Sequence, residues 1–309
     1  MAASPQPTAV MSQTAATPQA PLCAGPDFAP RKPKLVLPAG ATDTHAHVFG
    51  PAARYPYFAG RIYTPPDCLP SAYRHMLDTL GVERAVLVQP SVYGTDNRAM
   101  LDALAAAATT MRAVAVVDES IEDEALERLH AAGVRGVRCN VVDVQPQDRG
   151  RLPIEQLTRL GRRIKRFGWH IELLAHADEF PDMDRAFADF PVDLVLGHLG
   201  YMPTGKGLDA PGFKAMMRLM RDGRCWVKLT GPYRISASAL PYPDVTAFAH
   251  ALIDASPERV VWGTDWPHVM IKGAMPNDGA LADLLADWIP DAATRKRVLV
   301  DNPARLYGF

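Results

Sequence analysis

From residue 41 onward, short runs of β-branched and other apolar residues alternate with stretches in which apolar side chains recur every three or four positions. The first pattern is typical of buried strands and the second of amphipathic helices. The predicted strands are 41–48, 84–89, 112–117, 135–140, 169–174, 192–197, 225–230 and 259–263. The predicted helices are 71–80, 97–108, 122–132, 154–167, 178–189, 211–221, 244–255 and 278–288, and a last short helix, 292–299, precedes residues 301–309.

Eight strands, each followed by a helix, predict an α/β protein with a single (β/α)8 TIM barrel. The strands are apolar on both faces, as expected for a parallel sheet that is covered by helices. An open doubly wound sheet is the alternative, but no glycine-rich dinucleotide-binding or phosphate-binding motif follows the first strand. In a barrel, catalytic residues are expected at the carboxyl ends of the strands.

The first 40 residues differ in composition from the rest, because they hold 8 of the 28 prolines together with many Ala, Gln, Ser and Thr residues. This composition is typical of a disordered or loosely packed arm. The first basic residue is Arg31, so we do not expect a signal peptide. The predicted organisation is an N-terminal arm over 1–40 and a barrel over 41–309.

The charge balance narrows the class of partner. The 33 Lys and Arg residues against 34 Asp and Glu residues give a net charge of -1, which provides no general attraction for nucleic acid or an anionic membrane surface. No uncharged apolar run approaches the roughly 18 residues of a membrane span. Cys23, Cys68, Cys139 and Cys225 are widely separated, which favours reduced thiols and a cytoplasmic protein. No motif indicates a protein partner or an oligomeric state.

Polar residues gather at the predicted strand ends. His45 and His47 share one face of the first strand, because side chains two residues apart point the same way. A lone histidine is more often structural, but two at this spacing favour a functional site. His198 and Asp265 follow two later strands, and Asp265 suits a general base or a metal ligand. Arg138 needs an anion, either an internal carboxylate or a group of the substrate.

These motifs together resemble the amidohydrolase superfamily in its amidohydrolase-2 branch. The resemblance rests on His45-Ala46-His47, His198, Asp265 and the segment NPARLYG at 302–308, and it covers roughly residues 40–309. More narrowly, the segments DTHAHVFGP (43–51), QPS (89–91), GVR (136–138) and GTDWPH (263–268) resemble the 2-pyrone-4,6-dicarboxylate lactonases and the 4-sulfomuconolactone hydrolases. The resemblance also implies the barrel fold.

The resemblance implies a role for each candidate residue. It implies a base that activates water, Asp265, and three histidines around the lactone carbonyl, which are His45, His47 and His198. It implies a substrate-binding set, which is Arg138, Arg234, Tyr63 and Ser91. The assignment is chemically coherent, since ester hydrolysis needs a base, a stabiliser for the developing oxyanion and anchors for the anionic groups.

Two positions depart from the lactonase pattern. A second arginine that follows shortly after the first in the pyrone lactonases is absent, because residues 141–144 read VVDV and the next arginine is Arg149. The tyrosine expected near the end of the fifth strand is replaced by Leu173 or Leu174. The second anion is then held differently or is not a carboxylate, which makes a sulfonated lactone a candidate.

We favour a site without a metal ion or other cofactor. Arg138 stands in the strand where metal-dependent relatives contribute a Lys or Glu ligand, it cannot coordinate a metal, and it supplies a fixed positive charge. A single Zn²⁺ is the alternative, and its ligands would be His45, His47, His198 and Asp265.

The sequence predicts a hydrolase that opens a small dianionic lactone, 4-sulfomuconolactone-like or 2-pyrone-4,6-dicarboxylate-like, in the catabolism of aromatic compounds. A metal-dependent decarboxylase or amidohydrolase of the same branch is an alternative. A lactone isomerase is another, because Asp265 would then take a proton from a hydroxyl group instead of from water. An alternative from a different class of function is a catalytically inactive barrel that binds small anions. Such a protein would need only the arginines.

Overall fold

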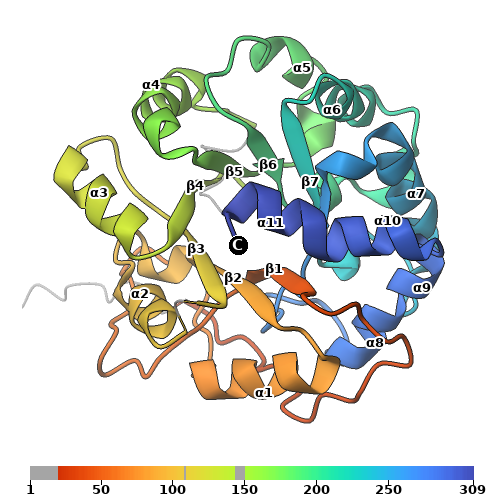
Figure 1. Ribbon diagram of the computed structural model, residues 1–309, viewed down its shortest axis with the longest axis horizontal. Helices are drawn as coiled ribbons and strands as arrows, with labels where there is room; N and C mark the ends of the chain where they lie inside the picture. Colours follow the sequence, from red (N-terminus) through yellow and green to blue (C-terminus); the bar gives the residue numbers. More distant parts are fainter. Residues whose placement is uncertain (1–19, 108, 143–149) are drawn as a thin grey trace, which may run out of the picture.

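The computed structural model describes residues 20–107, 109–142 and 150–309. Within these residues, eight parallel strands follow one another around a barrel in chain order, with helices outside them (Figure 1). The strands are β1 (Thr42–Ala46), β2 (Arg84–Val88), β3 (Met111–Ala115), β4 (Val134–Asn140), β5 (His170–Leu174), β6 (Leu194–Leu196), β7 (Cys225–Leu229) and β8 (Val260–Trp262). The eight predicted strands and the predicted (β/α)8 barrel are confirmed.

The barrel closes between β1 and the residues that follow β8. Ala46 and Trp266 form a parallel bridge, and the His47 backbone N–H donates to the Trp266 carbonyl at 2.8 Å. The Asp265 backbone N–H donates to the His45 carbonyl at 2.8 Å. The closure therefore brings the two histidines of the first strand directly beside the aspartate that follows the last one.

The Asp43 carboxylate fastens these two edges together. Its Oδ1 accepts from the backbone N–H groups of His45 at 3.0 Å and Thr264 at 2.9 Å. Its Oδ2 accepts from the hydroxyl groups of Tyr73 at 2.9 Å and Thr264 at 2.6 Å. Gly263 is required here, since a Cβ would lie 2.9 Å from Asp43 Oδ1 and 2.7 Å from the His45 nitrogen. Four hydrogen bonds thus satisfy a fully buried carboxylate.

Helices cover the outside of the barrel with their apolar faces. They include α1 (Pro70–Leu80), α2 (Arg98–Ala105), α3 (Asp123–Ala131), α4 (Ile154–Ile164), α6 (Pro211–Arg221) and α7 (Thr246–Ala255), each close to its predicted range. Helix α1 shows the pattern, because its buried residues recur on one side and Gly81 ends it with a φ of 76°. None of the described helices is long and apolar enough to cross a bilayer.

Three parts of the helical prediction differ from the structure. The helix predicted over 178–189 is reduced to α5 (Met183–Ala186), because Pro181 cannot continue a helix. The helix predicted over 278–288 is divided into α8 (Asp278–Asp283) and α9 (Leu285–Trp288). The prediction ended its last helix at residue 299, but helical structure continues. The helical structure in this part of the chain comprises α10 (Ala292–Lys296), a π-helical turn (Arg297–Asp301) and α11 (Asn302–Tyr307). Pro303 lies in the first turn of α11.

Helix α11 lies across the end of the barrel that faces the viewer in Figure 1. Tyr307 packs with Val86, Val88 and Val114, which point into the barrel from β2 and β3. The Lys228 ammonium lies 5.8 Å from the centre of the Tyr307 ring. The helix therefore closes the amino-terminal end of the barrel and leaves the carboxyl end for the polar residues.

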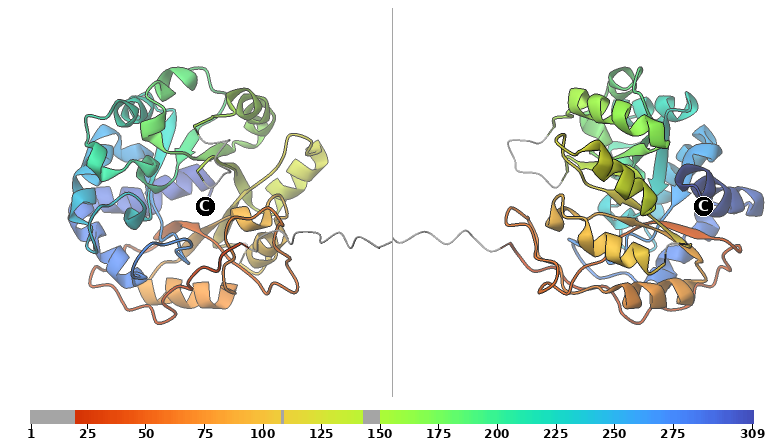
Figure 2. Two further views of the ribbon diagram at one scale, coloured as in Figure 1. Left: turned by 180° about the vertical axis from the view of Figure 1, so that it is seen from behind. Right: turned by 60° about the vertical axis from the view of Figure 1, so that its left-hand side comes forward.

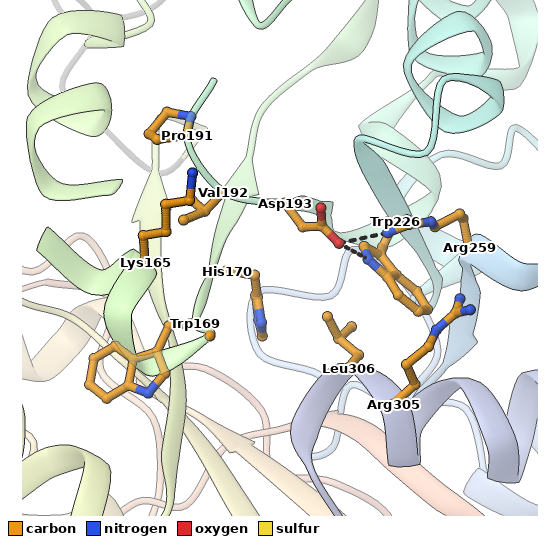
Figure 3. A pocket seen from close by; sticks show the side chains of 11 residues that line it. Lys165, Trp169, His170, Pro191, Val192, Asp193, Trp226, Arg259, Arg305 and Leu306 are labelled. Carbon is orange, nitrogen blue, oxygen red and sulfur yellow. Dashed lines mark hydrogen bonds and ion pairs between the residues drawn. The ribbon is translucent and has the colours of Figure 1, made fainter. Parts of the chain in front are cut away.

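The pocket in Figure 3 lies at this amino-terminal end, since it is lined by residues that begin β5 and β7 and by residues of α11. Its volume is about 340 Å³. The Asp193 carboxylate in its wall accepts from Trp226 Nε1 at 2.8 Å and Arg259 Nη1 at 2.6 Å. These charges are paired with one another, and this end of a TIM barrel generally serves stability rather than catalysis.

Part of the predicted arm contacts the barrel. Asn277, which caps α8, donates to Asp27 Oδ2 at 2.8 Å and accepts from the Arg31 backbone N–H at 3.0 Å. Arg31 also pairs with Asp283 at 2.8 Å. Residues 1–19 of the predicted arm lie outside the described residues. Closer to residue 20 the arm pairs instead with the loop between β1 and α1, where the Cys23 backbone N–H donates to the Thr64 carbonyl at 2.8 Å. In Figure 2 the red start of the described chain runs around the lower part of the barrel.

The Asp43 contact generates a prediction about pH. Burial raises the pKa of Asp43 to about 6 against the opposing effect of its hydrogen bonds. The folded chain therefore holds this proton more strongly than the unfolded chain, so Asp43 contributes stability at low pH that is lost as the pH rises through 6. From pH 7 to pH 5, the free energy of unfolding of the wild type should increase by about 1.4 kcal/mol relative to Asp43→Asn.

Urea titrations of both proteins at the two pH values measure this difference. Asn at position 43 keeps an acceptor for the two backbone N–H groups, and its amide can donate to the two hydroxyl groups. A difference that does not change between the two pH values would contradict the raised pKa.

Candidate active site

Three histidines meet at the carboxyl end of the barrel. His45 lies near the end of β1, His47 follows that strand, and His198 begins the turn after β6. The centre of the His45 ring is 5.0 Å from that of His47 and 4.8 Å from that of His198. All three are buried. The spacing in the first strand thus does direct both of its imidazoles to one side, as predicted.

Asp265 completes this cluster from the residues after β8. Its Oδ1 is 3.7 Å from His45 Nε2 and 4.0 Å from His47 Nε2, and its Oδ2 is 3.8 Å from His198 Nδ1. The structure therefore brings together all four residues that the sequence proposes as catalytic. His198, at φ 49°, and Asp265, at φ 66°, adopt left-handed backbone conformations, which are costly for residues with a Cβ and occur preferentially at functional sites.

The two oxygens of Asp265 have different surroundings. Oδ2 accepts from the Tyr233 hydroxyl at 2.7 Å and from Arg234 Nε at 2.7 Å. Oδ1 is buried and has no hydrogen-bond partner among the described residues. One oxygen is therefore held in place by the protein, and the other is free to accept a proton from a bound molecule.

Burial sets the charge of the cluster. It lowers the pKa of His45 well below the usual range, with a further effect from the Lys228 ammonium. It lowers the pKa of His47 to about 4 and that of His198 to about 3. Burial alone would raise the pKa of Asp265, but the Arg234 guanidinium and the histidines hold it well below its usual range. At neutral pH the site thus contains three neutral imidazoles and one carboxylate.

Hydrogen bonds assign the tautomers of two histidines. His47 Nδ1 lies 2.7 Å from the Val88 carbonyl, which only accepts, so Nδ1 carries the proton and Nε2 has a free lone pair. His45 Nδ1 makes a hydrogen bond of 3.3 Å with the Lys228 ammonium, which only donates. This contact favours the tautomer of His45 that carries its proton on Nε2, which faces Asp265. One imidazole presents an acceptor to the site and the other presents a donor.

A buried ion pair supports His45 from below. Lys228 on β7 donates to Glu172 Oε2 on β5 at 2.5 Å and to the Thr44 carbonyl at 2.7 Å. Glu172 Oε1 is 3.2 Å from His45 Nδ1 but makes no hydrogen bond among the described residues. Both side chains are buried inside the barrel. The pair thus fixes the position of His45 from the side opposite to Asp265.

The two proposed arginines lie in different environments. Arg138 on β4 is 8% exposed and donates to the Gln89 carbonyl at 2.9 Å. Among the described residues no carboxylate lies within ion-pair distance of Arg138, and its Nε has no partner. Arg234 donates from Nη2 to the Val269 carbonyl at 3.1 Å, in addition to its contact with Asp265. Arg138 therefore lacks an anion, whereas Arg234 already has one.

The other two proposed substrate-binding residues lie in loops that follow strands. Tyr63 is buried in the loop between β1 and α1 and belongs to the main apolar core. Ser91 begins the short 3-10 turn after β2. Their roles stay as the resemblance implies them. The segment that departs from the lactonase pattern, 141–144, is described only to residue 142, so Asp143 and Val144, like Arg149, lie outside the described residues.

Sequence reasoning missed two groups of polar residues. Glu172 and Lys228 are charged residues within apolar strands, and this was a signal that they point into the barrel. Tyr233, His268 and Asp278 come from the loops after β7 and β8 and from the start of α8. Their grouping depends on loop conformation, which periodicity does not predict.

One set of described residues could hold a metal ion. The candidate ligand atoms of His45, His198 and Asp265 all lie within 4.8 Å of one another, and all three residues are buried. Their identity and spacing are compatible with a divalent cation such as Zn²⁺.

Comparison with known proteins places the chain in a family. The model of the amidohydrolase family matches residues 42–309. The chain belongs to the amidohydrolase family. A 2-pyrone-4,6-dicarboxylate hydrolase from Comamonas testosteroni is 39% identical over 291 residues, which cover 90% of this chain and 93% of that protein. A 4-sulfomuconolactone hydrolase from Hydrogenophaga intermedia is 36% identical and covers 93% of this chain and 95% of its own length.

The solved structure of a putative 2-pyrone-4,6-dicarboxylic acid hydrolase supports the fold. A Pseudomonas putida protein of known structure is 32% identical, covers 88% of this chain and 98% of its own, and has a TM-score of 0.76. The match therefore extends over most of both chains.

The buried ion pair between Lys228 and Glu172 generates a prediction about the stability of this protein. Lys228→Met should lower the free energy of unfolding by about 3–5 kcal/mol, because it leaves the Glu172 carboxylate buried without its partner. The double variant Lys228→Met/Glu172→Leu should recover much of this loss, since an apolar pair of similar volume needs no compensating charge. Urea unfolding of both variants measures the two values. A loss below about 1 kcal/mol in the single variant would contradict the pairing.

Proposed function

We propose that this amidohydrolase hydrolyses the ester bond of a small lactone that carries anionic groups, in the catabolism of aromatic compounds. The observation that carries the proposal is the Asp265 carboxylate, which is buried among three neutral histidines and whose Oδ1 has no hydrogen-bond partner in the part of the chain that the structure describes. Two relatives that align over most of the chain hydrolyse lactones by name. The Arg138 guanidinium, buried without a carboxylate among the described residues, supports an anionic substrate.

The reaction begins with a water molecule between two acceptors. Asp265 Oδ1 and His47 Nε2 are 4.0 Å apart, a spacing that allows both hydrogens of one water to be accepted at once. The lone pairs of this water are then free to attack the lactone carbonyl carbon. Asp265 takes one proton as the water adds, and it thereby acts as a general base.

His45 stabilises the charge that develops on the carbonyl oxygen. Its Nε2 carries a proton in the tautomer that Lys228 imposes, so it can donate to the oxyanion. Because the site is buried, such a donor is more effective than it would be in water. The ring C–O bond then breaks, and the proton on Asp265 passes to the leaving oxygen. The products are a carboxylic acid, which ionises, and a hydroxyl group.

The anionic groups of the lactone orient the carbonyl. Arg138 is placed to receive one of them, since a guanidinium binds a carboxylate or sulfonate through two parallel N–H groups. Residues 141–144 read VVDV in the stretch where the pyrone lactonases carry a second arginine, which supports a 4-sulfomuconolactone-like substrate as a candidate beside a 2-pyrone-4,6-dicarboxylate-like one. Arg234 holds Asp265 before the substrate binds.

The proposed reaction proceeds without a metal ion. A metal bound by His45, His198 and Asp265 would polarise the carbonyl or acidify the water. The contact of His45 Nδ1 with the Lys228 ammonium favours the tautomer with the proton on Nε2, which has no lone pair for a metal, and this supports a metal-free site. Metal analysis of untagged protein tests this point, and a stoichiometric metal whose removal abolishes turnover would overturn it.

The reaction needs no nucleic acid, membrane or protein partner. The four cysteines form no disulfide, which supports a reducing compartment such as the cytoplasm.

A lactone panel in water enriched in oxygen-18 tests the proposed function. Hydrolysis inserts one solvent oxygen into the new carboxyl group, whereas an isomerase inserts none. The expected result is labelled product from 4-sulfomuconolactone or 2-pyrone-4,6-dicarboxylate. Binding without turnover across the panel would favour an inactive anion-binding barrel and contradict the proposal.

Asp265→Asn tests the base. The amide keeps the shape of the carboxylate and a hydrogen-bonding oxygen but cannot take the proton from water. We expect turnover to fall by roughly 10²–10⁴-fold while KM changes within a few-fold. Steady-state kinetics measure both values. Near-normal turnover with a large rise in KM would show that Asp265 orients the substrate and that the base lies elsewhere.

Arg138→Met tests the anion anchor. If the guanidinium meets a desolvated anion, the variant should bind anionic lactones more weakly by about 2–5 kcal/mol and neutral lactones almost unchanged. The comparison of kcat/KM for one lactone of each kind measures the difference. An equal loss for both lactones would mean that Arg138 has only a structural role.

A further inference from the structure

A continuous chain of hydrogen bonds leads from Asp265 away from the three histidines of the site. The Tyr233 hydroxyl lies 2.7 Å from Asp265 Oδ2 and 2.9 Å from His268 Nδ1. His268 Nε2 lies 3.1 Å from Asp278 Oδ1. His268 and Asp278 are fully buried. The four side chains come from the residues after β8, the turn after β7, the β8–α8 loop and the start of α8.

The direction of each hydrogen bond follows from the number of available protons. Asp265 Oδ2 accepts from Arg234 Nε and from the Tyr233 hydroxyl, so the Tyr233 proton points to Oδ2. The Tyr233 oxygen can then only accept from His268, and His268 Nδ1 must carry a proton. The other ring nitrogen, Nε2, faces Asp278 Oδ1. With the Tyr233 proton on Oδ2, the bond between Tyr233 and His268 forms only if His268 Nδ1 donates.

We propose that Tyr233, His268 and Asp278 are positioning residues for Asp265, which hold the Tyr233 hydroxyl as a fixed donor to Oδ2 and thereby leave Oδ1 as the basic oxygen. This inference rests on the proposed lactone hydrolysis for its catalytic consequence, but the direction of the hydrogen bonds does not depend on it.

Two donors from different directions make the arrangement rigid. Arg234 Nε and the Tyr233 hydroxyl both reach Oδ2 at 2.7 Å, so the carboxylate cannot rotate without breaking two bonds. A rotated carboxylate would turn Oδ2, which already accepts two hydrogen bonds, toward the water. His268 keeps Tyr233 from adopting another rotamer, and Asp278 fixes the ring of His268. The base is thus held in one orientation before the substrate enters.

Nuclear magnetic resonance of the protein with ¹⁵N-labelled histidine tests the direction of the bonds. The signals of His268 are assigned by their absence in His268→Asn. The expected result is that His268 Nδ1 carries a proton in the free wild-type protein. An Nδ1 without a proton would mean that Tyr233 donates to His268 and not to Asp265, and it would overturn the proposal whatever the enzyme hydrolyses.

Kinetics of Tyr233→Phe test the catalytic consequence. The variant loses one donor to Oδ2 and leaves the His268–Asp278 pair intact, so kcat should fall about 10–100-fold while KM stays within about threefold. The matched control is Tyr242→Phe, which removes the hydroxyl of a neighbouring buried tyrosine whose ring centre lies 6.5 Å from that of Tyr233. The control should keep the wild-type kcat.

A conservative substitution separates positioning from simple packing. Asn at position 268 can still donate an N–H to the Tyr233 oxygen, whereas Leu cannot. We expect His268→Asn to retain at least severalfold more kcat than His268→Leu when both are compared as folded protein. Equal kcat values for the two variants, or an unchanged kcat in Tyr233→Phe, would overturn the proposal. A wild-type enzyme that hydrolyses no lactone would instead refute the proposed function and leave the hydrogen-bond test valid.

Discussion

The hydrogen bonds of the Asp43 carboxylate are the constraint on which the rest of the site depends. They join β1 to the residues after β8, and this junction is the point at which the ring of strands closes. The same junction carries His45 and His47 on one side and Asp265 on the other. Because Gly263 has no side chain, the backbones of the two segments can approach each other closely. The contacts that close the barrel are therefore also those that bring Asp265 beside the two histidines of the first strand.

Burial gives these residues properties that the same side chains lack in water. The histidines stay neutral because charging them would cost hydration, and hydrogen bonds to Val88 and Lys228 then decide which nitrogen bears the proton. Asp265 keeps its charge only because Arg234 and other polar groups compensate for the lost water. A neutral hydrogen-bond donor, a neutral acceptor and a charged carboxylate thus face one small volume from which most water is excluded.

Sequence patterns predicted the strands and the histidine pair because both follow simple periodicities. Alternation along β1 was sufficient to place His45 and His47 together, and the strand count predicted that Asp265 would be near them. The partners of Asp265 could not be predicted in this way. Tyr233 and His268 lie in loops, and His268 has a φ of 61°, a backbone conformation that no hydrophobic pattern encodes. The helix expected over 178–189 was wrong for a local reason, since Pro181 interrupts it.

The buried guanidinium of Arg138 has a consequence for how the protein behaves in ordinary buffers. Its charge is compensated by the Gln89 carbonyl but by no carboxylate among the described residues. Any small anion that reaches it binds the folded chain and not the unfolded one, so it stabilises the fold by mass action. Sulfate, phosphate or citrate in a storage buffer would therefore raise the melting temperature and, at the same time, compete with the substrate. On the proposed role of Arg138, protection by such an anion and inhibition by it would have the same cause.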